Sequence, residues 1–195
     1  MMSNNITFEG GFSMPTIRGK TLRPYLGLPI IMLALPLLYW RQIDWFTLLW
    51  CQIVIVFGYV AAVVDFKKLE VPNRLILAMI SAWVVTIVPM LFIDITTTIN
   101  VMIGSLIGFI VGGGLFLLIY LLSKKSIGGG DVKFMAALGL FLGFTGTLTV
   151  MLYGSLFAAI TAGVLLMMKK VNRKSQIPLI PFLYLGTLAS VFFRG

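Results

Sequence analysis

The feature that most constrains the fold is a succession of long apolar runs separated by short polar loops. These runs cover most of the 195 residues, and only 11% of the chain is charged. The mean hydropathy is +1.05, whereas about a quarter of the residues in a typical soluble domain are charged. In lipid, a helix satisfies its own backbone hydrogen bonds. The sequence therefore predicts an all-α, polytopic integral membrane protein built as a helical bundle.

The runs predict six to seven transmembrane helices, since a crossing needs about 20 mostly apolar residues. The expected spans are Leu26–Trp40, Trp45–Val64, Leu75–Ile93, Ile99–Leu122, Val132–Phe144, Thr147–Met168 and Leu179–Phe193. The run at 132–144 is short for an independent crossing. The first run has no small-residue cleavage site after it and is expected to remain as an anchor. Residues 1–24 are expected to form a cytoplasmic segment, and residues 25–195 a single membrane-embedded domain.

The basic residues fall almost entirely on one side of a seven-span arrangement. Of the 15 lysine and arginine residues, only Arg41 and Arg194 lie on the other side. Because loops rich in these residues stay in the cytoplasm, the split predicts a plasma-membrane protein with a cytoplasmic N-terminus and an external C-terminus. It also favours counting 132–144 as a crossing. The net charge of +9 is thus assigned to orientation and to contact with membrane lipids, and nucleic acid is not expected as a partner.

Residue types that many enzymes rely on are missing from the sequence. The chain has no histidine and a single cysteine, Cys51, which lies inside an apolar run. Histidine-based triads, intrachain disulfides and metal sites built on cysteine or histidine are therefore excluded. Neither a metal nor a cofactor is expected.

Rows of small residues spaced four apart predict close contacts between helices. The rows are Gly104, Gly108 and Gly112; Gly139 and Gly143; and Gly154, Ala158 and Ala162. Small side chains let helix backbones approach one another in lipid. These rows are interpreted as packing surfaces and not as binding sites.

Two aspartates stand out because each lies at the predicted cytoplasmic end of a helix. Asp65 ends the second expected span and Asp131 begins the fifth, so both carboxylates are expected at a similar depth. An ionisable residue at such a position is costly to bury and is therefore a functional candidate. A structural role is open for each. Asp131 could cap its own helix, and Asp65 could end a helix at the interface beside Lys67 or Lys68.

A pair of neighbouring carboxylates supports hydrolysis without histidine, cysteine or metal. Two close carboxylates do not easily ionise together, so one keeps a proton while the charged one activates water. The protonated partner can donate a hydrogen bond to a peptide carbonyl. Before Asp131 stand Gly128, Gly129 and Gly130. They allow unusual backbone conformations and leave room for an extended substrate. The two aspartates therefore predict the mechanism of an aspartic protease.

Three motifs carry a resemblance to a known family. DFKKLEVPN runs from Asp65 to Asn73, GGGDVK from Gly128 to Lys133, and IPLIPFLYLG from Ile177 to Gly186. In this order they resemble the motifs of the type IV prepilin peptidases and the archaeal preflagellin peptidases, which are GxGD membrane aspartic proteases. The resemblance extends over most of the chain, from about residue 45 to 190.

The resemblance implies an endopeptidase that removes the basic leader from pilin-like or flagellin-like precursors at the cytoplasmic face. Asp65 and Asp131 would be its catalytic pair. Residues expected to bind substrate or shape the loops are Gly128, Gly130, Lys133, Pro72 and Asn73. Pro72 and Asn73 also fit an ordinary helix start, with Asn73 as the cap. The paired Cys-x-x-Cys motifs of larger bacterial members are missing, so the chain resembles the short form with peptidase activity alone.

Two other functions remain open. A presenilin-like intramembrane protease also uses a GxGD motif, but Val64 replaces the tyrosine expected before Asp65, and no Pro-Ala-Leu motif follows. A proton-coupled transporter usually carries carboxylates near mid-bilayer at broken helices, where the expected spans have none. Both alternatives fit the sequence less well than a leader peptidase.

Overall fold

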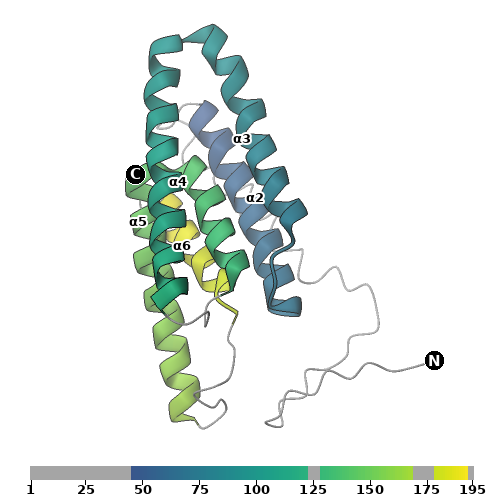
Figure 1. Cartoon of the computed structure of the whole chain (residues 1–195), viewed down its shortest axis with the longest axis vertical. Coiled ribbons are helices and arrows are strands. Elements are labelled where there is room, and N and C mark those ends of the chain that lie inside the picture. The colour runs from purple at the N-terminus through teal and green to yellow at the C-terminus, as the bar shows by residue number, and fades with distance from the viewer. Residues whose placement is uncertain (1–44, 123–127, 169–177, 193–195) are drawn as a thin grey trace, which may run out of the picture.

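The computed structural model describes residues 45–122, 128–168 and 178–192 (Figure 1). Its helices are α2 (Trp45–Lys68), α3 (Asn73–Ile93), α4 (Ile95–Leu122), α5 (Gly129–Met167) and α6 (Ile180–Phe192). These described residues are helical apart from short connections, which confirms the predicted all-α class. The expected cytoplasmic segment 1–24 and the expected span Leu26–Trp40 lie outside the described residues, as does the boundary between the two predicted domains.

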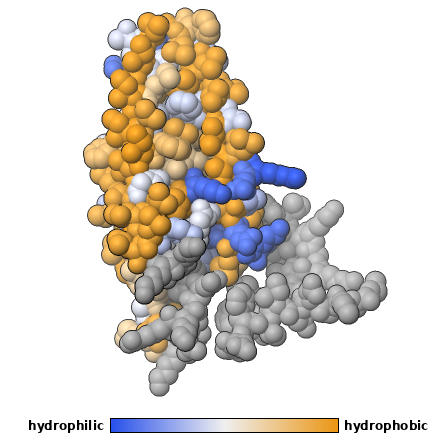
Figure 2. All heavy atoms as spheres, in the orientation of Figure 1, coloured by the Kyte–Doolittle hydropathy of each residue, from blue (hydrophilic) through white to orange (hydrophobic). Residues whose placement is uncertain are grey.

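The outer surface of the bundle is apolar over most of its length. Four helices, α2 to α5, are long and apolar enough to cross a bilayer, and α6 contributes a shorter apolar stretch, Ile180–Val191. Large apolar side chains on these helices face outwards; Phe92, for example, is 88% exposed. A broad hydrophobic region covers the face shown in Figure 2. Because so large an exposed apolar surface requires lipid around it, the protein is a multi-pass membrane protein. The total of six to seven spans stays a prediction.

Helix α5 is broken at Gly143 into a first arm (129–142) and a second arm (144–167). Gly143 has φ 65° and ψ −169°, a backbone conformation that side chains other than glycine rarely allow. The break reverses the chain, since Met135 before it and Thr147 after it both pack against Gly112 of α4. The sequence predicted two helices here, at 132–144 and 147–168. It assigned Gly143 to a packing row, whereas this glycine makes the turn.

Glycines bring α4 into backbone contact with the first arm. A Cβ added to Gly108 would overlap the carbonyl oxygen of Gly139, and a Cβ on Gly139 would overlap that of Gly108. A Cβ on Gly112 would lie 2.6 Å from the carbonyl oxygen of Met135. The predicted packing row is therefore confirmed at Gly108 and Gly112, while Gly104 faces open space. The packing holds the first arm, and the aspartate at its start, tightly against α4.

The first arm lies in the interior of the bundle. Phe134, Met135 and Leu138 are fully buried, and they share a core with Ile55 of α2 and Leu183 of α6. A helix surrounded by other helices can be apolar on every side. This position explains why residues 132–144 form a short run that is apolar all round.

One end of the bundle collects the end of α2 and the starts of α3, α5 and α6 (Figure 1). All the basic residues that the structure describes belong to these helix ends, and we call this the basic end: Lys67, Lys68, Arg74 and Lys133. Asp94 lies at the opposite end, between α3 and α4. For the described loops, this grouping agrees with the predicted topology. Which end faces the cytoplasm stays a prediction.

Candidate active site

Asp65 is buried at the basic end of α2, with 4% of its surface exposed. Its Oδ2 accepts a 3.1 Å hydrogen bond from the backbone amide of Ile180 at the start of α6. The structure records no ion pair between Asp65 and any described lysine or arginine. The interpretation of Asp65 as an interface charge paired with Lys67 or Lys68 is therefore wrong.

Asp131 occupies the first turn of the first arm and is 8% exposed. Its Oδ2 accepts a 3.2 Å hydrogen bond from the amide of Gly128, and its own amide donates a 3.1 Å hydrogen bond to the Gly128 carbonyl. The Asp131 side chain thus accepts the amide of the N-cap residue, as the N3 side chain does in one half of a capping box. The structural role predicted for Asp131, as a cap of its own helix, is confirmed. The cap does not exclude a second role, because it leaves the carboxyl group buried beside α2.

The carboxyl groups of Asp65 and Asp131 lie near enough to interact electrostatically, although 66 positions separate them in the chain. They come from the end of α2 and the start of α5, and both are buried. No basic side chain among the described residues neutralises either of them. Two buried carboxyl groups that interact in this way can share a single proton. The structure thus brings together the two aspartates that the sequence selected.

The loops around the two aspartates contact one another. A Cβ on Gly130 would lie 3.1 Å from the Cβ of Val71, so this glycine allows the two segments to pack closely. The ammonium group of Lys133 donates a 3.0 Å hydrogen bond to Oδ1 of Asn73. Pro72 occupies the cap position of α3, and Asn73 is its first residue. The prediction that Asn73 caps α3 is therefore wrong, because its side chain accepts a hydrogen bond from Lys133 instead.

The contact between Asp65 and α6 was missed by the sequence analysis. The motif IPLIPFLYLG was noticed, but Leu179 and Ile180 were given no role. Ile180 contacts Asp65 through its backbone amide, which leaves no mark in a pattern of side chains. The available signal was the pair of prolines, Pro178 and Pro181, which marks an unusual helix start.

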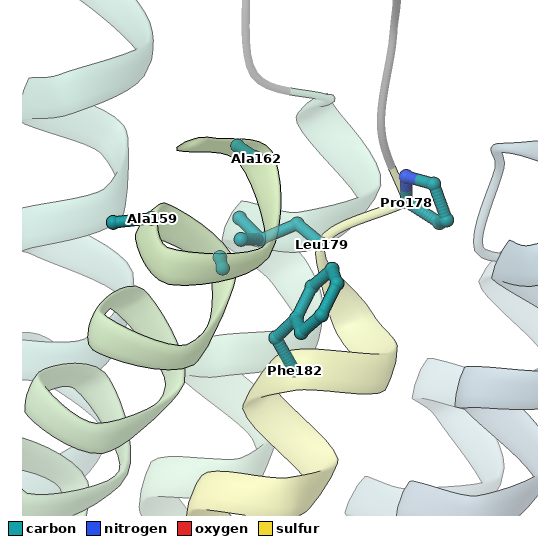
Figure 3. A pocket seen from close by; sticks show the side chains of 6 residues that line it. Ala159, Ala162, Pro178, Leu179 and Phe182 are labelled. Atoms are coloured by element: carbon teal, nitrogen blue, oxygen red, sulfur yellow. The ribbon is translucent and has the colours of Figure 1, made fainter. Parts of the chain in front are cut away.

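An open apolar pocket of about 250 Å³ lies between the second arm of α5 and the start of α6 (Figure 3). Its lining consists of Ala158, Ala159, Ala162, Pro178, Leu179 and Phe182. Leu179 in this lining directly precedes Ile180, whose amide donates to Asp65, so the pocket begins beside the residue that contacts Asp65. Its apolar lining suits aliphatic or aromatic groups. In the described part of the chain, no group of three or more histidine, cysteine, aspartate or glutamate side chains could hold a metal ion.

The fold and the site together define a class: multi-pass membrane proteins with a buried aspartate pair at one end of a helical bundle. Residues 52–163 match the family model described as the type IV leader peptidase family. This match covers more than half of the chain and includes both Asp65 and Asp131. The chain therefore belongs to the type IV leader peptidase family, which confirms the family predicted from the motifs.

One curated relative supports this membership. The chain is 37% identical over 75 residues to a prepilin leader peptidase/N-methyltransferase from Xanthomonas campestris pv. campestris. The aligned part covers 38% of this chain and 26% of the relative, so the chain matches about a quarter of that protein's length. No solved structure matches the chain.

Proposed function

We propose that the protein is a membrane aspartic endopeptidase that removes the leader from pilin-like or flagellin-like precursors at the cytoplasmic face. The observation that carries the proposal is the approach of two buried carboxyl groups, Asp65 and Asp131, at the basic end of the bundle. Membership of the type IV leader peptidase family supports this reaction, as does the name of the curated relative.

The proposed mechanism uses the pair with one proton between the two carboxyl groups. The charged carboxylate takes a proton from a water molecule, which attacks the carbonyl carbon of the scissile peptide bond. The protonated partner donates its proton to the carbonyl oxygen, so no free oxyanion forms. When the C–N bond of the tetrahedral intermediate breaks, the carboxyl group that took the water proton passes it to the leaving amine, and the partner takes a proton back from a hydroxyl of the intermediate, which leaves as the new carboxyl group. The cycle ends with one proton on the pair again.

The position of the pair suits a precursor that is itself anchored in the membrane. Asp65 and Asp131 lie where apolar helices meet the basic end. A precursor with an apolar helix in the bilayer would present the residues just before that helix at this depth. The pocket beside Leu179 offers a surface for apolar side chains of such a substrate. Gly128, Gly130, Lys133, Pro72 and Asn73 would shape the approach to the pair.

A cleavage assay tests the proposal directly. The purified protein, reconstituted in liposomes, is incubated with a synthetic precursor that joins a basic leader to an apolar helix, and the products are identified by mass spectrometry. We expect one cut at the boundary between leader and helix. Cleavage should persist in EDTA and after Cys51→Ala, because the mechanism uses neither metal nor thiol.

Each alternative outcome has a clear meaning. Cuts within the apolar helix would indicate a presenilin-like intramembrane protease. Proton flux across the liposome membrane without any cleavage would indicate a transporter. Activity that is lost in EDTA and restored by zinc would contradict the proposed mechanism.

A further inference from the structure

The start of α6 directs a backbone donor at the carboxylate of Asp65. Pro178 and Pro181 carry no amide hydrogen, and the amide of Phe182 donates to the carbonyl of Leu179 at 3.1 Å. Within residues 178–182, Leu179 and Ile180 are therefore the residues whose amides remain. Of these two, the Ile180 amide donates to Asp65. The two prolines thus leave few free amides at the start of α6, and one of these binds Asp65 at the end of α2.

This contact is sheltered from water on both sides. Asp65 is 4% exposed, and Ile180 is completely buried. A hydrogen bond to a carboxylate is strengthened by the low dielectric of such surroundings. Helix α6 has no acidic residue in its own first turn. Asp65 therefore supplies the negative group that the N-terminus of a helix favours.

Helix α6 itself packs tightly against the second arm of α5. A Cβ on Gly186 would lie 2.8 Å from both the Gly154 amide nitrogen and the Val150 carbonyl oxygen of the second arm. Leu183, one turn after the start of α6, is fully buried in the same contact region. Packing against the second arm therefore contributes to the position of the Ile180 amide. A carboxylate that binds to it takes its orientation from α6.

We propose that the start of α6 is a positioning element for the hydrolytic reaction, in which the Ile180 amide orients the Asp65 carboxylate towards Asp131. The proposal rests on the proposed function of the aspartate pair. Asp131 is held in an equivalent way by the amide of Gly128 in its own loop. Each carboxyl group of the pair is therefore oriented by a backbone amide. For Asp65 that amide belongs to Ile180, which lies in the motif IPLIPFLYLG.

The test removes this donor while keeping the helix. Ile180 is the first residue of α6, a position where proline is well tolerated because the amide has no partner within the helix. Ile180→Pro should lower kcat for precursor cleavage about tenfold or more, the loss expected when a preorganised hydrogen bond is removed. KM should stay within about twofold, because this amide contacts Asp65 and not the substrate. Ile180→Val keeps the donor and removes one methyl group, so its loss of kcat should be much smaller than that of Ile180→Pro.

A second variant keeps the side chain unchanged. The α-hydroxy acid analogue of isoleucine, incorporated at position 180 by nonsense suppression, replaces the N–H by oxygen. This backbone ester should show the same loss of kcat with the parent's KM. It should unfold at a lower temperature than the parent, because a buried hydrogen bond is lost, but stay folded at the temperature of the assay. An ester variant that cleaves as fast as the parent would overturn the positioning role, as would equal losses in the ester and Ile180→Val. Failure of the parent itself to cleave any precursor would instead overturn the proposed function.

Discussion

The two ends of the bundle hold aspartates in the same local role but in different surroundings. Asp94, which precedes α4, accepts hydrogen bonds from the Thr97 amide at 3.1 Å and from the Thr97 hydroxyl at 2.6 Å. Asp131 and Asp65 likewise accept backbone amides at helix starts. Asp94, however, is exposed. The other two are buried and lie near each other. Capping alone therefore does not separate a structural aspartate from a functional one.

The largest expected effect tests this difference at the pair itself. Asp65→Asn and Asp131→Asn should each reduce precursor cleavage by at least about a thousandfold, because an amide cannot act as a general base or share a proton. Both variants should insert and fold, since asparagine caps a helix about as well as aspartate. The measurement is the rate of cleavage in liposomes per mole of folded protein.

The double variant sharpens this test. Residues that act as one unit give non-additive losses, so Asp65→Asn combined with Asp131→Asn should be little worse than either single change. Near-normal cleavage by either single variant would reduce that aspartate to a cap, like Asp94.

The second expected effect separates the two carboxyl groups without changing either. A Cβ at Gly108 would overlap the carbonyl oxygen of Gly139, so Gly108→Ala should push the first arm, with Asp131, away from its place. Overpacking of this kind costs about 1–3 kcal/mol of stability, and we expect cleavage to fall about tenfold or more through lost alignment. Cleavage rate and thermal unfolding are measured on the same samples.

The same helix supplies a matched control. Gly104, one turn earlier on α4, has no atom within 4 Å of an added Cβ. Gly104→Ala should therefore leave cleavage unchanged and stabilise the helix slightly, because alanine replaces glycine within it. Equal losses in Gly104→Ala and Gly108→Ala would show that the contact between α4 and the first arm does not align the pair.

Much of the fold follows from composition and the spacing of apolar runs. Helix α3, at Asn73–Ile93, begins two residues before its predicted start and ends where predicted. The gap predicted between 144 and 147 lies next to the observed break at Gly143. These features are predictable because lipid requires long apolar helices, and a helix must end where its run ends. The aspartate pair was found because acidic residues at such positions are rare.

What the sequence did not reveal depends on contacts between distant backbones. The hydrogen bond from Ile180 to Asp65 joins residues 115 positions apart and uses no side chain of α6. The side chain of Asn73 looked like a local cap, but it accepts a hydrogen bond from Lys133, 60 positions away. Gly143 fitted a packing row by spacing, and only its backbone angles identify it as a turn. In each case tertiary packing decides between roles that are equally good locally.

The smallest expected effect concerns Asp94, the exposed aspartate at the opposite end of the bundle. Hydrogen bonds from the hydroxyl and then the amide of Thr97 hold the pKa of the Asp94 carboxyl below its ordinary value of 3.8. A carboxyl group whose pKa is lowered on folding contributes its full stabilisation at pH values above its pKa in the unfolded chain. That stabilisation is lost as the pH falls through the pKa of the folded state.

At neutral pH, Asp94→Asn should therefore cleave precursor like the parent and unfold at most a few degrees lower. Thermal unfolding midpoints of parent and variant, measured from about pH 7 to pH 3, should converge as the acid limit is approached. A difference that grows with acidity, or a loss of cleavage in Asp94→Asn, would mean that Asp94 is not the exposed local cap that distinguishes it from Asp65 and Asp131.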